Sequence, residues 1–338
     1  MKINKYLFDF INKINYGEKE LFSISLAFVL TALDIIISWL FHIGSALALP
    51  LICVCMSPLY LLAFRAGIAY ATISTIGSFI FLAFLKDFIY ASIQIALLWL
   101  PALIASTLIL LNRKNAKGSK VYLPLPQLFF SLLLVNIAVI SSILTIILHN
   151  PTNIAFLKGL ISNQLNYISE ANSTLPSSMQ LHFIEVKKVI LNNFLKILTC
   201  LVSIYNIVFM LSNLYIGLTI GKRFKLLSRK SFYWPKDLRL PLAALVIFIL
   251  SLLAFMVKSN IIPLYAIIVI SSFGVAFFMC GIAYWHDITR KVPFRILILS
   301  FTYIGLLFKD ASPALCCTVL LMGLWSTIKH YKIHKYLL

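Results

Sequence analysis

Charged residues are scarce in this chain, and acidic residues are the scarcest of them. Charged side chains make up 12% of its 338 residues, with 10 Asp and Glu against 29 Lys and Arg, whereas 61% of the residues are hydrophobic. Soluble domains are about half apolar and about one-quarter charged, so this composition excludes an ordinary soluble domain. Many apolar runs reach the roughly 20 residues that cross a hydrocarbon core as a helix. We therefore expect an all-α polytopic membrane protein.

The familiar catalytic and nucleotide-binding motifs are also absent. The sequence contains no G-x-x-x-x-G-K-[ST], no H-E-x-x-H, no G-x-S-x-G and no G-x-G-x-x-G. It has no clustered pair of acidic residues of the kind that a metal-dependent lipid transferase uses. These absences disfavour an ATPase and the familiar membrane hydrolases. We predict no catalytic residue, no cofactor and no enzyme activity, and an enzyme without these motifs stays an open alternative.

Disulfide and metal-binding patterns are missing as well. All six cysteines lie inside apolar runs, and none forms a C-x-x-C pair. We interpret them as small buried hydrophobic residues. His330 and His334 have the i, i+4 spacing of helical metal ligands, but they lie in a basic tail with no third ligand nearby. We predict no metal site.

The apolar runs divide the chain into two membrane halves around one long loop. We expect five spans in residues 21–149 and three to five in residues 196–328, with residues 1–20 and the basic tail 329–338 in the cytoplasm. The last two runs are short and could together form a re-entrant hairpin, so the predicted bundle has eight to ten transmembrane helices. The runs are 21–41, 46–64, 67–85, 88–111, 127–149, 196–220, 240–257, 262–284, 295–308 and 312–328.

Lysine and arginine are distributed unevenly between the two sides of this bundle. With the amino terminus inside, all but seven of the 29 fall in inner segments; the seven are Lys86, Lys158, Lys187, Lys188, Lys196, Lys258 and Lys309. Cytoplasmic loops carry such an excess, which places both termini in the cytoplasm. Topology and attraction to the lipid bilayer explain the basic loops, so we predict no nucleic-acid partner.

The predicted outer loop, residues 150–195, is too long for a simple connection. Apolar residues recur in it at three- and four-residue steps: Ile154, Leu157, Ile161, Leu165 and Ile168. This spacing predicts a helix with an apolar stripe, followed by a break at 171–176. Ser177-Ser178-Met179-Gln180 matches a capping box, which predicts a second helix that continues into the sixth span. We expect an outer-face helical hairpin that either covers a cavity as a lid or packs on the lipid surface.

Asp34 is the acid that lies well inside a predicted span. A carboxylate at that depth costs about 2.5–3.5 kcal/mol on insertion scales, so we expect it to face the bundle beside a polar partner. The partners that we consider are Lys86, His42 and Gln94. Gln94 and Asn136 are themselves polar at membrane depth, as are Asn206 and Asn213. Asp34, Gln94 and Asn136 are our candidates for a small-molecule site, and structural hydrogen bonding between helices is the alternative.

Small residues recur at four-residue spacing on several predicted helices. Such faces let helix backbones approach closely, either inside one chain or against another membrane subunit. Ser23, Ala27, Thr31, Gly67 and Ala71 are our candidates for helix docking. A further set of this spacing lies in the eighth span: Ser272, Ala276 and Cys280.

Several short motifs lie in order along most of the chain: Ser57-Pro58-Leu59, Arg65-Ala66-Gly67, Arg239-Leu240-Pro241, Gly281-Ile282-Ala283-Tyr284-Trp285-His286, and Gly305 with Asp310. Together they resemble the YybS-like family of bacterial multi-pass membrane proteins, a domain of unknown function, and this resemblance implies a protein of the bacterial cytoplasmic (inner) membrane. The family has no established activity, and its amino-terminal half is similar to the substrate-binding subunits of energy-coupling-factor vitamin transporters. Those subunits have six helices and dock a partner through small residues of the first helix, a position that Ser23, Ala27 and Thr31 occupy here. The additional spans and the long outer loop depart from that pattern, and no vitamin-contacting residue carries over.

Three functions therefore compete. The first is a small-molecule binding or transport-related membrane subunit with Asp34, Gln94 and Asn136 at its site. The alternative is a non-catalytic scaffold or assembly factor that binds another membrane protein through its small-residue faces. The third, a membrane enzyme with Asp34 or His286 as its base, ranks last because a catalytic site needs several convergent groups.

Overall fold

The chain folds into a bundle of α-helices with one short β-hairpin. The computed structural model describes residues 16–42, 47–114, 120–171, 177–227, 232–259 and 261–335. Most of the predicted cytoplasmic segment 1–20 lies outside these residues. The elements of the first half are α2 (Tyr16–His42), α3 (Ala48–Ile52), α4 (Ser57–Ala66), α5 (Ile68–Leu85), α6 (Phe88–Gln94), α7 (Leu100–Leu110), β1 (Asn112–Lys114), β2 (Lys120–Tyr122) and α8 (Leu125–His149).

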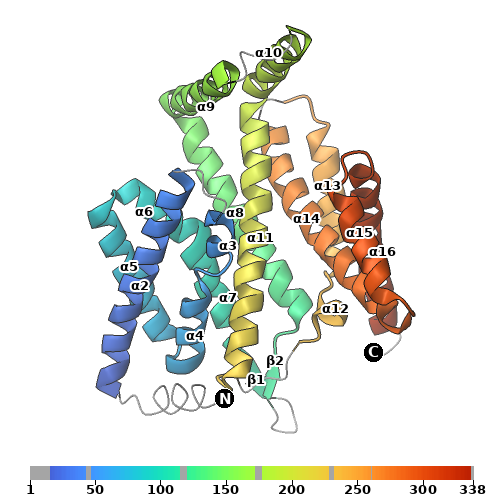
Figure 1. Cartoon of the computed structure of the whole chain (residues 1–338). Coiled ribbons are helices and arrows are strands. Elements are labelled where there is room, and N and C mark those ends of the chain that lie inside the picture. Colours follow the sequence, from blue (N-terminus) through green and yellow to red (C-terminus); the bar gives the residue numbers. More distant parts are fainter. Residues whose placement is uncertain are drawn as a thin grey trace.

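The second half begins with two helices that lie across one end of the bundle (Figure 1). They are α9 (Pro151–Ala171) and α10 (Ser177–Asn192), and they confirm the prediction of two helices in the long loop. The second helix does not continue unbroken into the next span, because the chain bends at Asn193. The remaining helices are α11 (Phe194–Arg223), α12 (Trp234–Asp237), α13 (Leu242–Phe255), α14 (Ile262–Ile288), α15 (Arg295–Leu307) and α16 (Ser312–Lys335).

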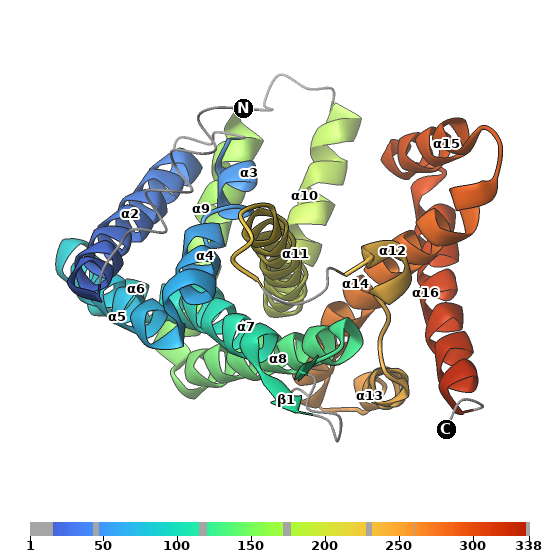
Figure 2. The same cartoon turned by 90° about the horizontal axis from the view of Figure 1, so that it is seen from below.

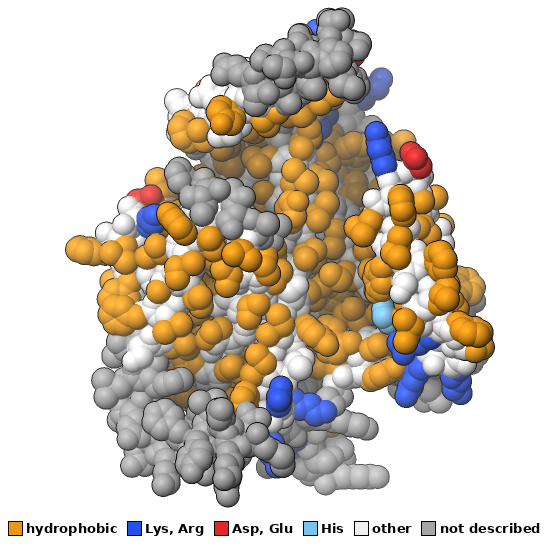
Figure 3. All heavy atoms as spheres, viewed as in Figure 1, with side chains coloured by type: hydrophobic (Ala, Val, Ile, Leu, Met, Phe, Trp, Pro, Cys, Tyr) orange, Lys and Arg blue, Asp and Glu red, His pale blue; other side chains and the backbone are white. Residues whose placement is uncertain are grey.

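Six helical segments are long and apolar enough to cross a membrane. They are Ile68–Leu85, Phe88–Leu110, Leu125–His149, Phe194–Arg223, Ile262–Lys291 and Ser312–Lys329. Shorter apolar helices occupy Ser25–Leu40, Pro50–Ala66, Leu242–Phe255 and Arg295–Leu307. Hydrophobic side chains cover the middle of the face in Figure 3, and Lys and Arg side chains gather towards its ends. The expectation of an all-α, multi-pass membrane protein is therefore confirmed.

Helix α11 lies between two groups of helices (Figure 2). It contacts α4, α7 and α8 on one side and α14 on the other. Glycines permit the close crossing with α4, because a Cβ on Gly217 would come within 2.8 Å of Tyr60, and one on Gly221 within 2.8 Å of Phe64. The carboxyl-terminal helices α13 and α16 pack on α14, and α15 packs on α16 without burying any of its own residues.

The predicted second span is two short helices rather than one. The chain turns at residues 53–56 between α3 and α4, which leaves backbone groups without helical partners. Asn213 of α11 supplies those partners. Its side-chain oxygen accepts a hydrogen bond from the Met56 N–H at 2.8 Å, and its amide donates to the Ile52 carbonyl at 2.8 Å. A single side chain thus stabilises a break at membrane depth, where an unsatisfied backbone group is costly.

The fourth span contains a π-helical turn, Ile95–Trp99, between α6 and α7. Pro101 lies two residues after the turn ends, and proline lacks an N–H donor while its ring crowds the carbonyl four residues earlier. The wider turn accommodates this conflict without ending the helix, which runs from Phe88 to Leu110. Single π turns inside α-helices occur frequently at functional sites.

The β-hairpin was not expected from the sequence. Strands β1 and β2 pair antiparallel with Arg113 opposite Val121, and they lie at the end of the bundle opposite α9 and α10 (Figure 1). The connection between the fourth and fifth spans is therefore partly ordered by its own backbone hydrogen bonds.

Candidate functional site

Asp34 lies on α2 and is buried inside the bundle, with 4% of its surface exposed. Its carboxylate hydrogen-bonds with the Tyr90 hydroxyl of α6. The second carboxylate oxygen, Oδ2, is buried and has no hydrogen-bond partner within the part of the chain that the structure describes. A buried acceptor without a donor is costly, so the position is poised to bind a proton or a positively charged group.

Tyr90 connects Asp34 to other polar side chains. Gln94, one helical turn along α6, donates from Nε2 to the Tyr90 hydroxyl at 3.0 Å, and Ser38 of α2 also bonds to that hydroxyl. We call Asp34, Ser38, Tyr90 and Gln94 the Asp34 cluster. Lys86, at the end of α5, acts on the carboxylate electrostatically. The Lys86 ammonium group and the Asp34 carboxylate are more than 4 Å apart. Within the described residues, the ion pair with a shorter separation is Arg239 with Asp287.

The structure separates Asn136 from this cluster, so the three predicted ligand residues do not form one site. Asn136 of α8 is fully buried and donates to the Ser272 hydroxyl of α14 at 3.0 Å. Asn206 of α11 donates to the Asn136 side-chain oxygen at 2.7 Å. These three residues bond to one another across three helices. Asn136 therefore makes the interhelical hydrogen bonds that were the alternative expectation, and its assignment as a ligand residue stays a prediction.

The predicted docking face of the first helix is occupied within the chain. Ala27 and Thr31 of α2 are 1% and 2% exposed. The Ser78 hydroxyl of α5 donates to the Ala27 carbonyl at 3.1 Å, and a Cβ on Gly77 would lie 3.1 Å from the Ala27 methyl group. Docking of another subunit through these residues would require α2 to leave α5. The side chain of Ser23 lies outside the described residues.

Of the other predicted docking residues, Ala71 is internal and Gly67 is partly exposed. Ala71 is fully buried in α5. Gly67 joins α4 to α5 with φ = +103°, a left-handed backbone conformation that glycine adopts readily and other residues rarely do. It connects α4 to α5, and its assignment to helix docking stays a prediction.

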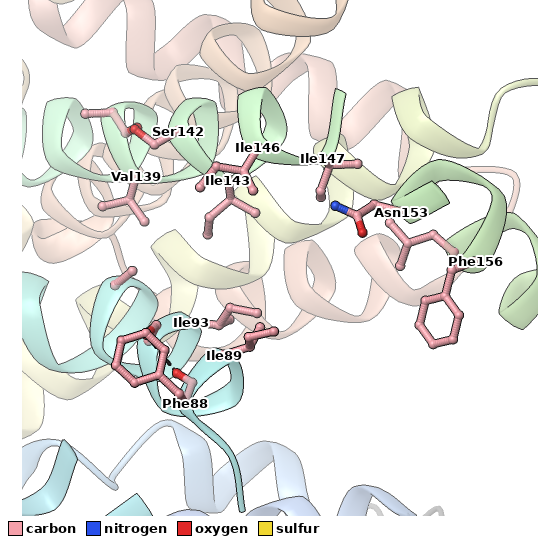
Figure 4. A pocket seen from close by; sticks show the side chains of 14 residues that line it. Phe88, Ile89, Ile93, Val139, Ser142, Ile143, Ile146, Ile147, Asn153 and Phe156 are labelled. Atoms are coloured by element: carbon pink, nitrogen blue, oxygen red, sulfur yellow. Dashed lines mark hydrogen bonds between the residues drawn. The ribbon is translucent and has the colours of Figure 1, made fainter. Parts of the chain in front are cut away.

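A groove lies on the opposite face of α6 from the Asp34 cluster. Its cavity volume is about 770 Å³, and it is bounded by α6, α8 and α9. Phe88, Ile89 and Ile93 of α6 face Val139, Ile143 and Ile146 of α8 across the space, and Asn153 and Phe156 of α9 close one end (Figure 4). One alternative from the sequence was that the helical loop covers a cavity; α9 closes one end of this groove, and Asp34 is not among the residues that line it.

Polar residues also gather where α14 meets α15, at the end of the bundle opposite α9. Arg239, 5% exposed, lies 3.8 Å from the Asp287 carboxylate, and burial lowers the pKa of its guanidinium. His286 bonds through Nε2 to the Tyr303 hydroxyl at 2.6 Å and through Nδ1 to Arg295 at 3.3 Å. His286 and Asp287 thus bind different partners, and each ties a neighbouring segment to α14.

Sequence reasoning missed two members of the Asp34 cluster, Tyr90 and Ser38. Tyr90 and Gln94 are four residues apart, a spacing that places two side chains on one helical face. This spacing was the signal in the sequence that could have placed Tyr90 beside Gln94. Within the described residues no group of three His, Cys, Asp or Glu could hold a metal ion, so the cluster offers one carboxylate with neutral polar neighbours. Comparison with models of protein families, with curated proteins and with solved structures found no match to this chain.

Proposed function

We propose that the chain is a transport-related binding subunit of the bacterial cytoplasmic membrane, which binds a small cation or a protonated amine at the Asp34 cluster. The observation that carries the proposal is the Asp34 carboxylate, which is buried in a membrane helix and whose Oδ2 has no hydrogen-bond donor among the residues that the structure describes. Ionisable residues at that depth are costly to insert and commonly mark ligand or ion sites. The resemblance to YybS-like proteins, and through them to vitamin-binding membrane subunits, points in the same direction.

The chemistry of the cluster favours a positively charged ligand. Tyr90 and Gln94 are neutral and already hydrogen-bonded to each other, so the unpaired oxygen of Asp34 is the group left to recognise a ligand. A cation there would satisfy both the charge and the unused acceptor. Lys86 lies at the exposed end of α5 and acts on the carboxylate electrostatically. The π turn begins directly after Gln94, and such turns occur frequently at functional sites.

The proposed topology places both termini in the cytoplasm, with eight to ten crossings and the α9–α10 hairpin on the outer face. It is supported by the excess of Lys and Arg in the segments assigned to the inside. The Asp34 cluster would then lie in the outer half of the bilayer, since Asp34 is closer to the outer end of α2 than to its start.

The test measures thermal unfolding of the protein in lipid nanodiscs with Na⁺, K⁺ and a panel of organic amines. A ligand at about 100 times its Kd adds about 2.7 kcal/mol to the stability of the protein, which is readily detected. We expect at least one of these to stabilise the wild type and not Asp34→Asn, which removes the charge and keeps the shape.

Asp87→Asn is the matched control. Asp87 is an exposed carboxylate that accepts from the Tyr90 N–H at 2.6 Å at the start of α6, and asparagine caps a helix equally well. This variant should respond to the ligand as the wild type does. The proposal fails if no compound stabilises the wild type, or if Asp34→Asn is stabilised to the same extent.

A further inference from the structure

The groove bounded by α6, α8 and α9 is apolar along most of its length. Its facing walls are aliphatic and aromatic, and Phe88, Ile89 and Ile146 are each more than 60% exposed towards it or towards its opening. Pockets of about 300–1,000 Å³ are the usual size for bound small molecules, and this groove of about 770 Å³ falls in that range. It is therefore large enough to hold an ordered molecule.

Water is a poor occupant of this groove. A buried water needs two to four polar partners. The two serine hydroxyls of the lining already donate to their own helices, Ser92 to the Phe88 carbonyl and Ser142 to the Ala138 carbonyl, each at 2.8 Å. The walls thus offer few free polar atoms, and an apolar occupant fits them better.

The place of the groove indicates which apolar molecule fills it. Its two long walls belong to Phe88–Leu110 and Leu125–His149, both apolar and long enough to span a membrane. Walls that cross the bilayer place the groove at the depth of the hydrocarbon. The apolar molecule available at that depth is the acyl chain of a lipid.

One end of the groove is polar, which matches an amphiphile. The α8–α9 junction carries His149 and Asn150, Asn153 lines the groove at that end, and Lys158 is exposed on α9. The helix α9 lies across the end of α8 (Figure 1), as an amphipathic helix at a membrane interface does. A lipid bound with its tail between α6 and α8 would have its headgroup at this junction.

We propose that this groove binds one phospholipid, with an acyl chain between α6 and α8 and the headgroup beside Asn153 at the α8–α9 junction. The bound chain fills the space beneath α9 and holds the hairpin against the bundle. The lipid site lies on the opposite face of α6 from Tyr90 and Gln94, and it does not depend on ligand binding at Asp34.

The test uses phosphatidylglycerol with a photoreactive diazirine in its acyl chain, incorporated into nanodiscs with the full chain. After illumination, mass spectrometry maps the labelled residues. We expect labelling to concentrate on the groove walls of α6 and α8. The indole ring of Ser142→Trp should fill the groove and displace the acyl chain. If about two methylene groups of that chain lose their burial, lipid binding weakens roughly tenfold, and labelling of the groove walls should fall by the same factor.

Thr318→Trp is the matched control. Thr318 of α16 is exposed, and its hydroxyl donates to the Ala314 carbonyl at 2.8 Å, as Ser142 does to Ala138. This variant should keep wild-type labelling of the groove. If Ser142→Trp does not fold, Ala138→Phe fills the same space from one turn earlier on α8 and should lower the labelling in the same direction.

Two outcomes would overturn the proposal. Labelling spread evenly over all lipid-facing helices, and unchanged by Ser142→Trp and Ala138→Phe, would show only the ordinary lipid shell. Disulfide cross-linking between two copies through Ile146→Cys, with no lipid labelling of the groove, would show that a second copy of the chain fills it. Neither readout changes if Asp34 binds nothing, so this proposal and the proposed function fail separately.

Discussion

Single polar side chains hold the membrane-depth contacts of this bundle together, and α11 carries two of them. Asn206 reaches Asn136 of α8, and Asn213 reaches the broken segment between α3 and α4. The two are seven residues apart, which places both on the same side of one helix over two turns. This side of α11 therefore fixes the positions of neighbouring helices by hydrogen bonds whose loss would leave buried polar atoms unpaired.

Asn213→Ala should destabilise the protein by roughly 2–4 kcal/mol, because the Met56 N–H and the Ile52 carbonyl would each lose a buried partner. The measurement is reversible unfolding in mixed detergent micelles. Asn112→Ala is the control, since Asn112 is exposed and its bond to the Leu110 carbonyl is replaceable by water. A control change above about 0.5 kcal/mol, or an Asn213→Ala effect no larger than the control, would contradict this role.

The sequence indicated which residues are polar at membrane depth, but not which of them meet. Asp34, Gln94 and Asn136 all stand out as polar residues in apolar runs, and grouping them required the order of helices around the bundle. Apolar runs carry no information about that order, because every lipid-facing or buried face is equally hydrophobic. Asp34 and Gln94 come together through Tyr90, whereas Asn136 joins α11 and α14.

At the scale of elements, run length predicted the helices well. All ten expected spans coincide with apolar helices or helix pairs, because about 20 apolar residues in succession have few other stable conformations. The turn at residues 53–56 and the π turn at Ile95–Trp99 escaped prediction. The first turn depends on hydrogen bonds from Asn213 of another helix, and the second depends on a wider hydrogen-bond pattern next to Pro101. Hydropathy contains no information about either.

Helices α14 and α16 cross closely because glycines lie at the crossing. A Cβ added to Gly323 would overlap the Phe277 carbonyl oxygen and lie 3.0 Å from the Gly281 nitrogen. Gly323→Ala should therefore push the helices apart and cost about 1–3 kcal/mol or more. The measurement is the unfolding free energy, with the loss of α16 contacts followed by limited proteolysis of the carboxyl-terminal helix.

Gly274→Ala on α14 is the matched control for this crossing. A Cβ there meets nothing within 4 Å, so only the intrinsic helix preference changes. That preference favours alanine by up to about 1 kcal/mol, and the variant should be as stable as the wild type or slightly more stable. Equal destabilisation by the two substitutions would show that the glycines act through helix flexibility rather than through close packing.

At the scale of the whole molecule, the number of crossings depends on α15. Its 13 residues extend about 20 Å, less than the roughly 30 Å of a hydrocarbon core. Helix α16 is 24 residues long and contains an apolar segment, Ser312–Lys329, long enough to cross. If α16 crosses, the chain between Arg290 and Ser312 must also reach the other side, with residues flanking α15 completing the distance. We therefore expect ten crossings, with Lys309 outside.

Labelling of single cysteines by a membrane-impermeant maleimide tests this topology in intact cells. In a background without the six native cysteines, Lys158→Cys and Lys309→Cys should be labelled from outside, because both side chains are exposed and lie in segments assigned to the outer face. Arg113→Cys and Arg290→Cys, exposed at the basic end, should be labelled only after the membrane is opened. Labelling of Arg290→Cys in intact cells would invert the orientation that the positive-inside rule predicts. If Lys158→Cys is labelled from outside but Lys309→Cys is labelled only in opened cells, α15 and α16 form a re-entrant hairpin and the number of crossings falls to eight.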